Sequence, residues 1–301
     1  MSVTNRRFAV ATLLTGVIAG LVGLACIHLL HWIQALAWDM HSGTLLEAVS
    51  ATSPARRVLN LSLGGILGAA SWFFLFRRSR AITSVSAAVG GAPMPPLRAT
   101  WHALTQVLIV GLGASVGREV APREMAAAFS AAAANRLGLT PEDRRIIVAC
   151  GAGAGLAAVY SIPISGAIYT LEILLVSRSR RAVAAAFCTS AIAVLISTGF
   201  TRPTPFYSVP TLTPSLSLTV FAALIGPLLG ATGWAFKQAV ARVGAARPRD
   251  WRLLASLPTA SFLVGIIAVW VPSVLGNGQA SAQTQFDAVW ATGAGLGIAA
   301  L

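Results

Sequence analysis

Charged residues are scarce in this sequence, and acidic residues are the scarcest. Asp and Glu number 9 against 22 Lys and Arg, and charged residues make up only 10% of the 301 residues. Soluble domains are about 25% charged, whereas here 56% of the residues are hydrophobic and the mean hydropathy is +0.75. The composition excludes an ordinary soluble domain and predicts one all-α transmembrane domain over residues 1–301.

Residue patterns of metal sites, disulfides and common hydrolases are also missing. The sequence contains neither HExxH nor GxSxG, and Ser115, the serine near Glu119, lacks a histidine partner. Cysteines and histidines are scattered without ligand spacing: Cys26, Cys150, Cys188, His28, His31, His41 and His102. We expect the histidines to lie at interfaces or in packing contacts. An intramembrane enzyme is the least favoured class, and we expect no metal and no cofactor.

Apolar segments free of charge recur along the whole chain. A helix needs about 20 apolar residues to cross a bilayer. Candidate segments lie at 8–30, 58–76, 103–117, 146–171, 182–201, 214–236, 253–275 and 288–301. Most can span, and the shorter ones are expected to be half-helices. Residues 8–30 are too long for a signal-peptide core and lack a convincing cleavage site, so a retained helix is favoured over a cleaved signal.

The net charge of +13 could indicate a nucleic-acid partner, but the basic residues stand at the ends of the apolar segments. They cluster at Arg6/Arg7, Arg77/Arg78/Arg80, Arg144/Arg145, Arg178/Arg180/Arg181 and from Lys237 to Arg252, whereas loops 38–57 and 202–213 carry few. Such a bias marks cytoplasmic loops. We predict a cytoplasmic N-terminus, a lipid bilayer as the partner of these charges, and no nucleic acid.

The most informative stretch is residues 111–136, where a glycine-rich segment leads into Arg118 and Glu119 and then into an alanine-rich run. Pro122 suits the first turn of a helix, so a helix is predicted to begin near Glu119–Pro122. Apolar flanks place this break at membrane depth, where irregular backbone is tolerated only if it is buried or lines a watery cavity. A helix N-terminus there forms an anion site.

A second informative stretch covers residues 147–176. Gly151, Gly153 and Gly155 permit close helix contact, and the Ser161-Ile162-Pro163 segment is predicted to end one helix and start the next. Glu172 lies near the end of this apolar run, just before a basic cluster. A structural or interfacial role is favoured for Glu172 over a reaction centre.

The chain carries a sequence match between two of its own segments. Residues 63–74 align with residues 225–236, and Trp72 and Trp234 coincide. Chance similarity between small-residue helices is the alternative, but the shared tryptophan spacing favours internal duplication, which is typical of transporters. The first repeat is then expected over about 8–177, and an incomplete second repeat over 182–301.

The segments GREVAP at 117–122 and GAGAGLAAVYSIPISGAIYTLE at 151–172 resemble the CLC chloride channel and transporter superfamily. Members of that family carry G-[RK]-E-G-P followed by a segment close to the second of these. The resemblance covers nearly the whole chain and implies an all-α fold of inverted repeats built from tilted and broken helices. It also implies a homodimer with a separate pore in each subunit. A divergent bacterial-type member in the inner membrane is expected.

The resemblance further implies chloride as the ligand and Glu119 as the gating glutamate. Gly117, Arg118, Glu119, Val120 and Ala121 become the expected ion-binding residues. In this mechanism the carboxylate is a tethered anion that occupies the anion site, and its protonation or displacement opens the pore. The alternative is that Glu119 simply pairs with Arg118, or with Arg123 one helical turn later.

Two departures from the family pattern alter the expected anion site. Val120 and Ala121 replace the family's Gly-Pro, and Pro122 comes one place later, which removes one amide donor. The family's filter motif G-S-G-I-P is not recognisable. Aligning residues 82–89 with that stretch makes Ser79 and Arg80 the candidate filter-position residues.

A third departure from the family pattern concerns the residues that carry protons. The family's paired glutamates become Glu172-Ile173 here, and the second acid of that pair is the inner proton relay in exchangers. Because isoleucine cannot carry a proton, a channel-like or loosely coupled transporter is favoured, although some exchangers of the family also lack that acid. The alternative is a divergent homologue that is selective for fluoride or another anion, or that does not conduct. The family's later G-x-F-x-P motif would fall after Leu301, so we expect a longer protein.

Overall fold

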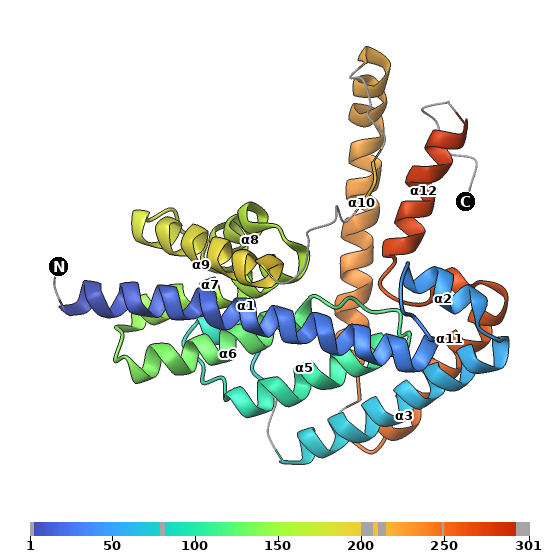
Figure 1. Ribbon diagram of the computed structural model, residues 1–301, viewed down its shortest axis with the longest axis horizontal. Helices are drawn as coiled ribbons and strands as arrows, with labels where there is room; N and C mark the ends of the chain where they lie inside the picture. The colour runs from blue at the N-terminus through green and yellow to red at the C-terminus, as the bar shows by residue number, and fades with distance from the viewer. Residues whose placement is uncertain (1–2, 79–81, 200–206, 210–214, 249, 293–301) are drawn as a thin grey trace.

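The computed structural model describes residues 3–78, 82–199, 207–209, 215–248 and 250–292, and every regular element in this part of the chain is helical (Figure 1). The helices are α1 (Val3–Trp38), α2 (Leu45–Ala51), α3 (Pro54–Arg78), α4 (Val85–Val89), α5 (Pro96–Gly111), α6 (Val120–Arg136), α7 (Pro141–Tyr160), α8 (Pro163–Tyr169), α9 (Arg180–Gly199), α10 (Leu216–Ala246), α11 (Leu253–Trp270) and α12 (Gln279–Thr292). A π-helical turn, η1 (Thr170–Leu175), extends α8, and a short 3-10 turn, η2 (Pro272–Val274), follows α11.

Five helices within the described residues are long and apolar enough to cross a membrane: α1, α3, α9, α10 and α11. The remaining predicted segments are broken or shortened. The segment at 146–171 is two helices, because Ser161 adopts a left-handed conformation (φ 55°) and Pro163 starts α8. That break confirms the prediction made from the Ser-Ile-Pro segment.

The predicted boundaries at 103–117 are wrong. Helix α5 begins earlier, at Pro96, because proline suits a first helical position. It also ends earlier, at Gly111, because Gly113 adopts a positive φ of 98° that interrupts the helix. The segment predicted at 288–301 lies mostly outside the described residues.

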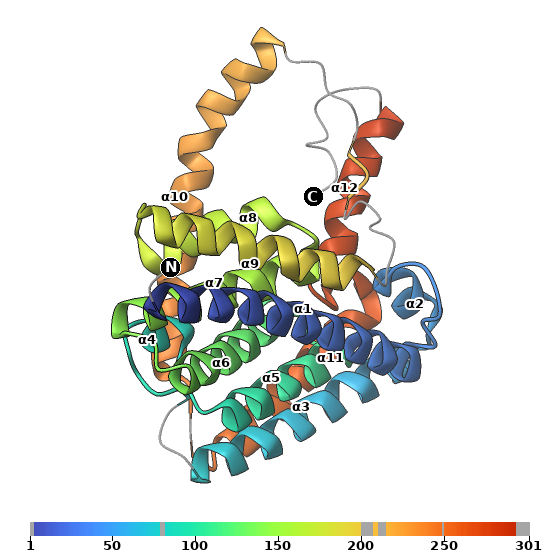
Figure 2. The same cartoon turned by 60° about the vertical axis from the view of Figure 1, so that its left-hand side comes forward.

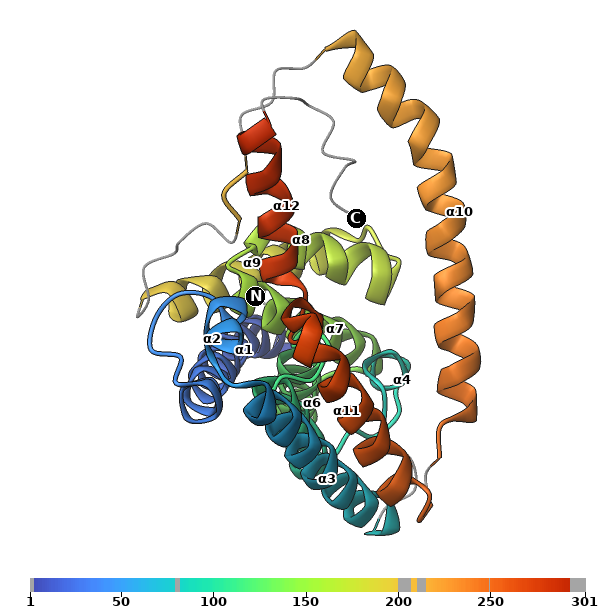
Figure 3. The ribbon, with the colours of Figure 1, turned by 90° about the vertical axis from the view of Figure 1, so that its right-hand side faces the viewer.

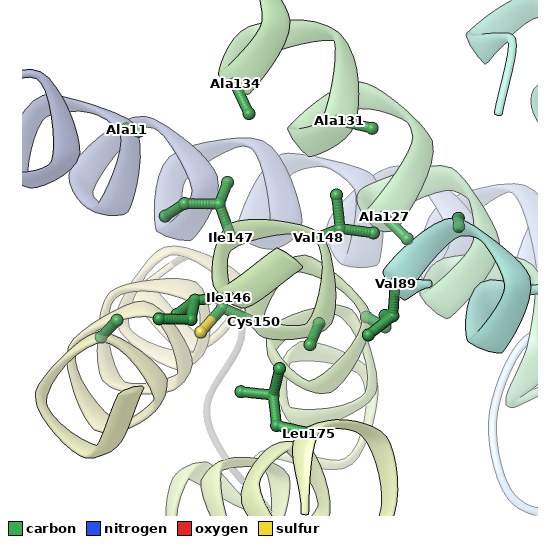
Figure 4. Packing of buried hydrophobic residues seen from close by; sticks show 14 of the residues in the cluster. Ala11, Val89, Ala127, Ala131, Ala134, Ile146, Ile147, Val148, Cys150 and Leu175 are labelled. Atoms are coloured by element: carbon green, nitrogen blue, oxygen red, sulfur yellow. The ribbon is translucent and has the colours of Figure 1, made fainter. Parts of the chain in front are cut away.

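Helix α7 is the centre of the packed body. It lies against α1, α6 and α9, and Figure 4 shows Ile147, Val148 and Cys150 of α7 with Ala131 of α6 on one side and Leu175 of η1 on the other. Small residues bring these helices together. A Cβ atom added at Gly155 would lie 2.5 Å from the carbonyl oxygen of Pro122 in α6, so the start of α6 is pressed directly against α7.

The later helices are packed differently. Helix α11 lies along α3, where a Cβ at Gly65 would lie 2.6 Å from Oγ of Ser261. Helix α10 has no buried residue, and Figures 2 and 3 show it running clear of the packed body. The two spans with matching sequences, 63–74 in α3 and 225–236 in α10, therefore lie in different surroundings. The division into two inverted repeats stays a prediction.

Candidate functional site

Glu119 stands at the N-terminus of α6, in the place that the sequence predicts. The helix begins at Val120, and Glu119 is the capping residue with φ −75° and ψ −28°. Its side chain does not cap the helix. Residues 112–119 form an irregular approach between α5 and α6. The first amides of α6, at Val120 and Ala121, therefore lack a capping partner from Glu119, which suits an anion site.

The Glu119 carboxylate turns back over the approach segment. Its Oε1 accepts a hydrogen bond from the hydroxyl of Tyr160, the last residue of α7. A Cβ atom at Gly117 would collide with Glu119 Oε2. Glycine at 117 is therefore required by this position of the carboxylate, and the end of α7 holds the carboxylate there.

Arg118, the residue before Glu119, also contacts Tyr160. Its guanidinium carbon lies 5.4 Å from the centroid of the Tyr160 ring. Arg118 also lines a small cavity with room for about one water molecule, together with residues of α1, α5 and α7: Cys26, Ile27, Leu30, Val107 and Val159. A cation beside a cavity at the start of α6 raises the positive potential to which the helix dipole already contributes.

Pairing with Arg118 or Arg123 was the alternative role for Glu119, and the ion pair with Arg123 is not formed among the described residues. Arg123 Nη1 instead donates to the hydroxyl of Tyr169 at 2.8 Å, and its guanidinium lies 5.6 Å from that ring. The expected ion-binding residues from Gly117 to Ala121 are contiguous at the head of α6. The candidate filter-position residues Ser79 and Arg80 lie outside the described residues.

Glu172 and Ile173 lie in η1 and are both exposed in the single chain. They lie on the extension of α8, after the break that follows Tyr160, the hydrogen-bond partner of Glu119. No group of three or more His, Cys, Asp or Glu side chains that could hold a metal ion occurs in the residues the structure describes.

The structure brings together two titratable residues that the sequence interpretation did not pair. Glu124 in α6 and His102 in α5 are hydrogen-bonded, with Oε2 and Nδ1 2.6 Å apart. Gln106, one turn beyond His102, lies 3.1 Å from the same nitrogen. The sequence signal that could have found them is an acid in the apolar run after Pro122, since an intramembrane acid normally has a partner.

Comparisons with known proteins give consistent results. The model of the family described as "Voltage gated chloride channel" matches residues 64–301. Curated relatives named "Voltage-gated ClC-type chloride channel ClcB", from Escherichia coli O81 and O157:H7, are 28% identical over 299 residues. The match covers 93% of this chain and 68% of each relative.

A solved structure gives the same result for the fold. The crystal structure titled as a slow cyanobacterial Cl−/H+ antiporter superposes with a TM-score of 0.75 at 19% sequence identity. The superposition covers 93% of this chain and 68% of the other. At that level of identity the likeness establishes the architecture, an all-helical polytopic membrane protein.

Proposed function

This chain belongs to the voltage-gated chloride channel family, and from that premise we propose that it moves chloride through a pore in each subunit, gated by the carboxylate of Glu119. The observation that carries the gate is the position of that carboxylate. It lies over Gly117 at the head of α6, held by the Tyr160 hydroxyl. A negative group tethered at a helix N-terminus competes with a free anion for the same positive end of the dipole.

In this proposal the charge of the Glu119 carboxylate decides whether the pore is closed or open. Deprotonated Glu119 occupies the site and excludes chloride. Protonation removes its charge, so its attraction to the positive end of the α6 dipole weakens and chloride can take its place. Arg118 supplies positive charge beside the site, which draws anions toward it. Pro122 contributes no amide, so fewer donors are available to hold the ion.

Two further features belong to the proposal. We infer a homodimer, because α8, η1 and α9 carry exposed large apolar side chains that a second copy could cover: Ile164, Ile168, Ile173, Phe187 and Leu195. We also infer a cytoplasmic N-terminus in a bacterial inner membrane, because the basic residues cluster at the ends that include Arg6 and Arg7.

A second candidate is selectivity for fluoride or another anion. It is favoured by the replacement of the family's Gly-Pro by Val120-Ala121, which changes the amides and the shape at the head of α6. Selectivity among anions depends on the number and position of such donors.

Efflux from proteoliposomes tests both candidates. Vesicles loaded with chloride or fluoride are diluted into ion-free medium, and ion-selective electrodes record efflux in the presence of a potassium shunt. We expect chloride efflux that rises as pH falls, and efflux by the Glu119→Gln variant that no longer depends on pH. Glu142→Gln, which neutralises an exposed acid in the first turn of α7, is the matched control and keeps the wild-type response.

Each result decides between the candidates. Fluoride efflux without chloride efflux supports the second candidate. A wild-type pH response in Glu119→Gln contradicts gating by Glu119, and no efflux of either ion contradicts transport.

A further inference from the structure

Glu124 and His102 form a buried titratable pair that the proposed gate does not use. Only 10% of the Glu124 side chain and 16% of the His102 side chain are exposed. Glu124 and Asp143 are the buried carboxylates among the described residues, and Asp143 pairs with Arg181 at the start of α7. Glu124 is therefore the buried acid that lies within the body of the helices.

Packing alone does not explain this pair. Replacing a buried ion pair by apolar residues of similar volume is often neutral or stabilising, and ionisable side chains in membrane segments are costly. Around the pair, Gln106 approaches His102 from the next turn, and the Trp72 ring of α3 lies 5.8 Å from the imidazole. A buried pair that costs folding free energy and has defined neighbours is a candidate functional site.

Within the described residues, His102 is the basic side chain that contacts Glu124. Helix α4 carries no titratable residue. The remaining titratable or charged residues on helices packed against α6 are, on α1, Arg6, Arg7, Cys26, His28 and His31; on α5, Arg98; and on α7, Glu142, Asp143, Arg144, Arg145, Cys150 and Tyr160. Arg144, for example, donates to the carbonyls of Ala88 and Ala92.

The pair lies on a definite side of the gate. Glu124 follows Glu119 by five residues, which is a rise of about 7.5 Å along α6. The far end of α6 lies beside the start of α1, because a Cβ at Gly138 would be 3.5 Å from Nη1 of Arg7. Since Arg7 belongs to the end that is inferred to be cytoplasmic, the pair lies between Glu119 and the cytoplasm.

We propose that Glu124 and His102 form a proton-binding site that loads Glu119 from the cytoplasmic side, the role that Ile173 cannot perform. The proposal rests on the proposed gate at Glu119. When the pair holds one shared proton it is neutral overall, as a buried pair must be to avoid an uncompensated charge. The N–H bond of the imidazolium breaks, the proton reaches a Glu119 oxygen to form an O–H bond, and a proton from cytoplasmic hydronium restores the pair.

A small cavity with room for about one water molecule lies beside Arg118. It is bordered by Val107, the residue after Gln106, and by Arg118, the residue before Glu119. Its lining contains none of the side chains of His102, Glu124 and Glu119, so it adjoins these residues along the chain only. Proton transfer over more than one hydrogen bond requires such a water.

Simultaneous recording of chloride and proton flux in proteoliposomes tests the site. In Glu124→Gln, which keeps the size of the side chain, we expect proton flux to fall by about a hundredfold while chloride flux continues. His102→Gln is expected to give the same separation. Glu172→Gln is the matched control, because it neutralises an exposed acid on η1, and it keeps both fluxes.

Failure of the proton-site proposal can be distinguished from failure of the proposed gating by Glu119. Proton flux that persists in both Glu124→Gln and His102→Gln overturns the proposal, as does a wild-type protein that moves chloride but no protons; in both cases Glu119 gating can still hold. Absence of both fluxes in the wild type overturns both proposals. If Glu124 and His102 only stabilised the fold, both fluxes would fall together with thermal stability.

A spectroscopic measurement covers the case in which Glu124→Gln does not fold. Infrared difference spectra of the wild type between high and low pH are expected to show a change at imidazole bands that His102→Asn removes. Unchanged imidazole bands in that comparison contradict the proposal, whatever the flux of the variants.

Discussion

Helices α7 and α10 are similar in sequence character and opposite in environment. Both are apolar and rich in glycine and alanine. In α7, most residues are buried, whereas α10 has no buried residue within the described chain. The comparison shows that small residues lead to close helix packing only where a partner helix lies against them.

The glycines make the contrast concrete. In α7, a Cβ at Gly153 would lie 2.6 Å from the carbonyl oxygen of Gly166, and one at Gly155 would be as close to Pro122. In α10, a Cβ at Gly226 or Gly230 would have no other heavy atom within 4 Å. The same residue type is therefore a close-contact point in one helix and an open surface in the other.

The largest loss of stability is expected from a substitution in α7, the packed helix of this comparison. Gly153→Val would force side-chain atoms into α8 and Thr170, and overpacking of this kind costs about 3 kcal/mol. Gly230→Val, the matched change in α10, meets open space and is expected to stay within about 0.5 kcal/mol. Thermal unfolding in detergent measures both. Equal losses in the two variants would contradict the contrast.

The second expected effect concerns α11, a late helix that, unlike α10, packs against the body through α3. Arg57 in α3 is buried and donates to the carbonyls of Val49 and Ser50 in α2 and to that of Ala268 in α11. Arg57→Met keeps much of the volume but leaves these acceptors unpaired, which is expected to cost about 2–3 kcal/mol.

Lysine is the control for the charge at position 57. It keeps the positive charge but cannot form the same fork of hydrogen bonds, so Arg57→Lys is expected to lie between the wild type and Arg57→Met in melting temperature. A variant with lysine as unstable as methionine would mean that geometry, and not charge, holds α11 to α3.

A smaller effect is expected at the C-terminal end of α1. Trp38 is 1% exposed, and its indole N–H donates to the carbonyl of Gly111 at 2.9 Å. Trp38→Phe removes that hydrogen bond and part of the ring, so a loss of about 1–2 kcal/mol is expected. Trp234→Phe, at an exposed position of α10, is the matched change, and a loss of similar size there would contradict the comparison.

The smallest expected effect depends on pH. Arg56 hydrogen-bonds to Asp39 just outside α1 and holds the pKa of that carboxyl below its usual range. The resulting stabilisation is present above the pKa of the unfolded chain and is lost as the pH falls through the lower, folded value. Because both side chains are near the surface, only a slight fall in melting temperature below about pH 4 is expected. Asp39→Asn should remove that slope.

Local chemistry made part of the site predictable. Pro122 indicated where α6 begins, and the Ser161-Ile162-Pro163 segment indicated the break after α7; the structure confirms both. These features depend on the conformations that proline and neighbouring residues can adopt, so they can be inferred from short stretches. The role of Glu119 as the gate stays a prediction.

Long-range contacts could not be inferred in the same way. The hydrogen bond from Tyr160 to Glu119 joins residues 41 positions apart, and the pair of His102 and Glu124 joins residues 22 positions apart on different helices. The sequence interpretation treated His102 as a packing residue because no ligand spacing surrounds it. Only the crossing of α5 and α6 brings its partner near.

The anchoring of residues 112–119 has a consequence for the speed of gating. Trp38 holds the start of this segment through Gly111, the carbonyl of Gly113 accepts a hydrogen bond from Gly276 N–H at 3.1 Å, and α7 presses on Pro122 beyond its end. With the backbone fixed at these points, release of Glu119 from Tyr160 is a rotation about side-chain bonds. Such rotations take nanoseconds, whereas rearranging a loop takes far longer. A gate at Glu119 would then open as soon as a proton arrives, and the rate at which protons reach Glu119 would limit the rate of opening.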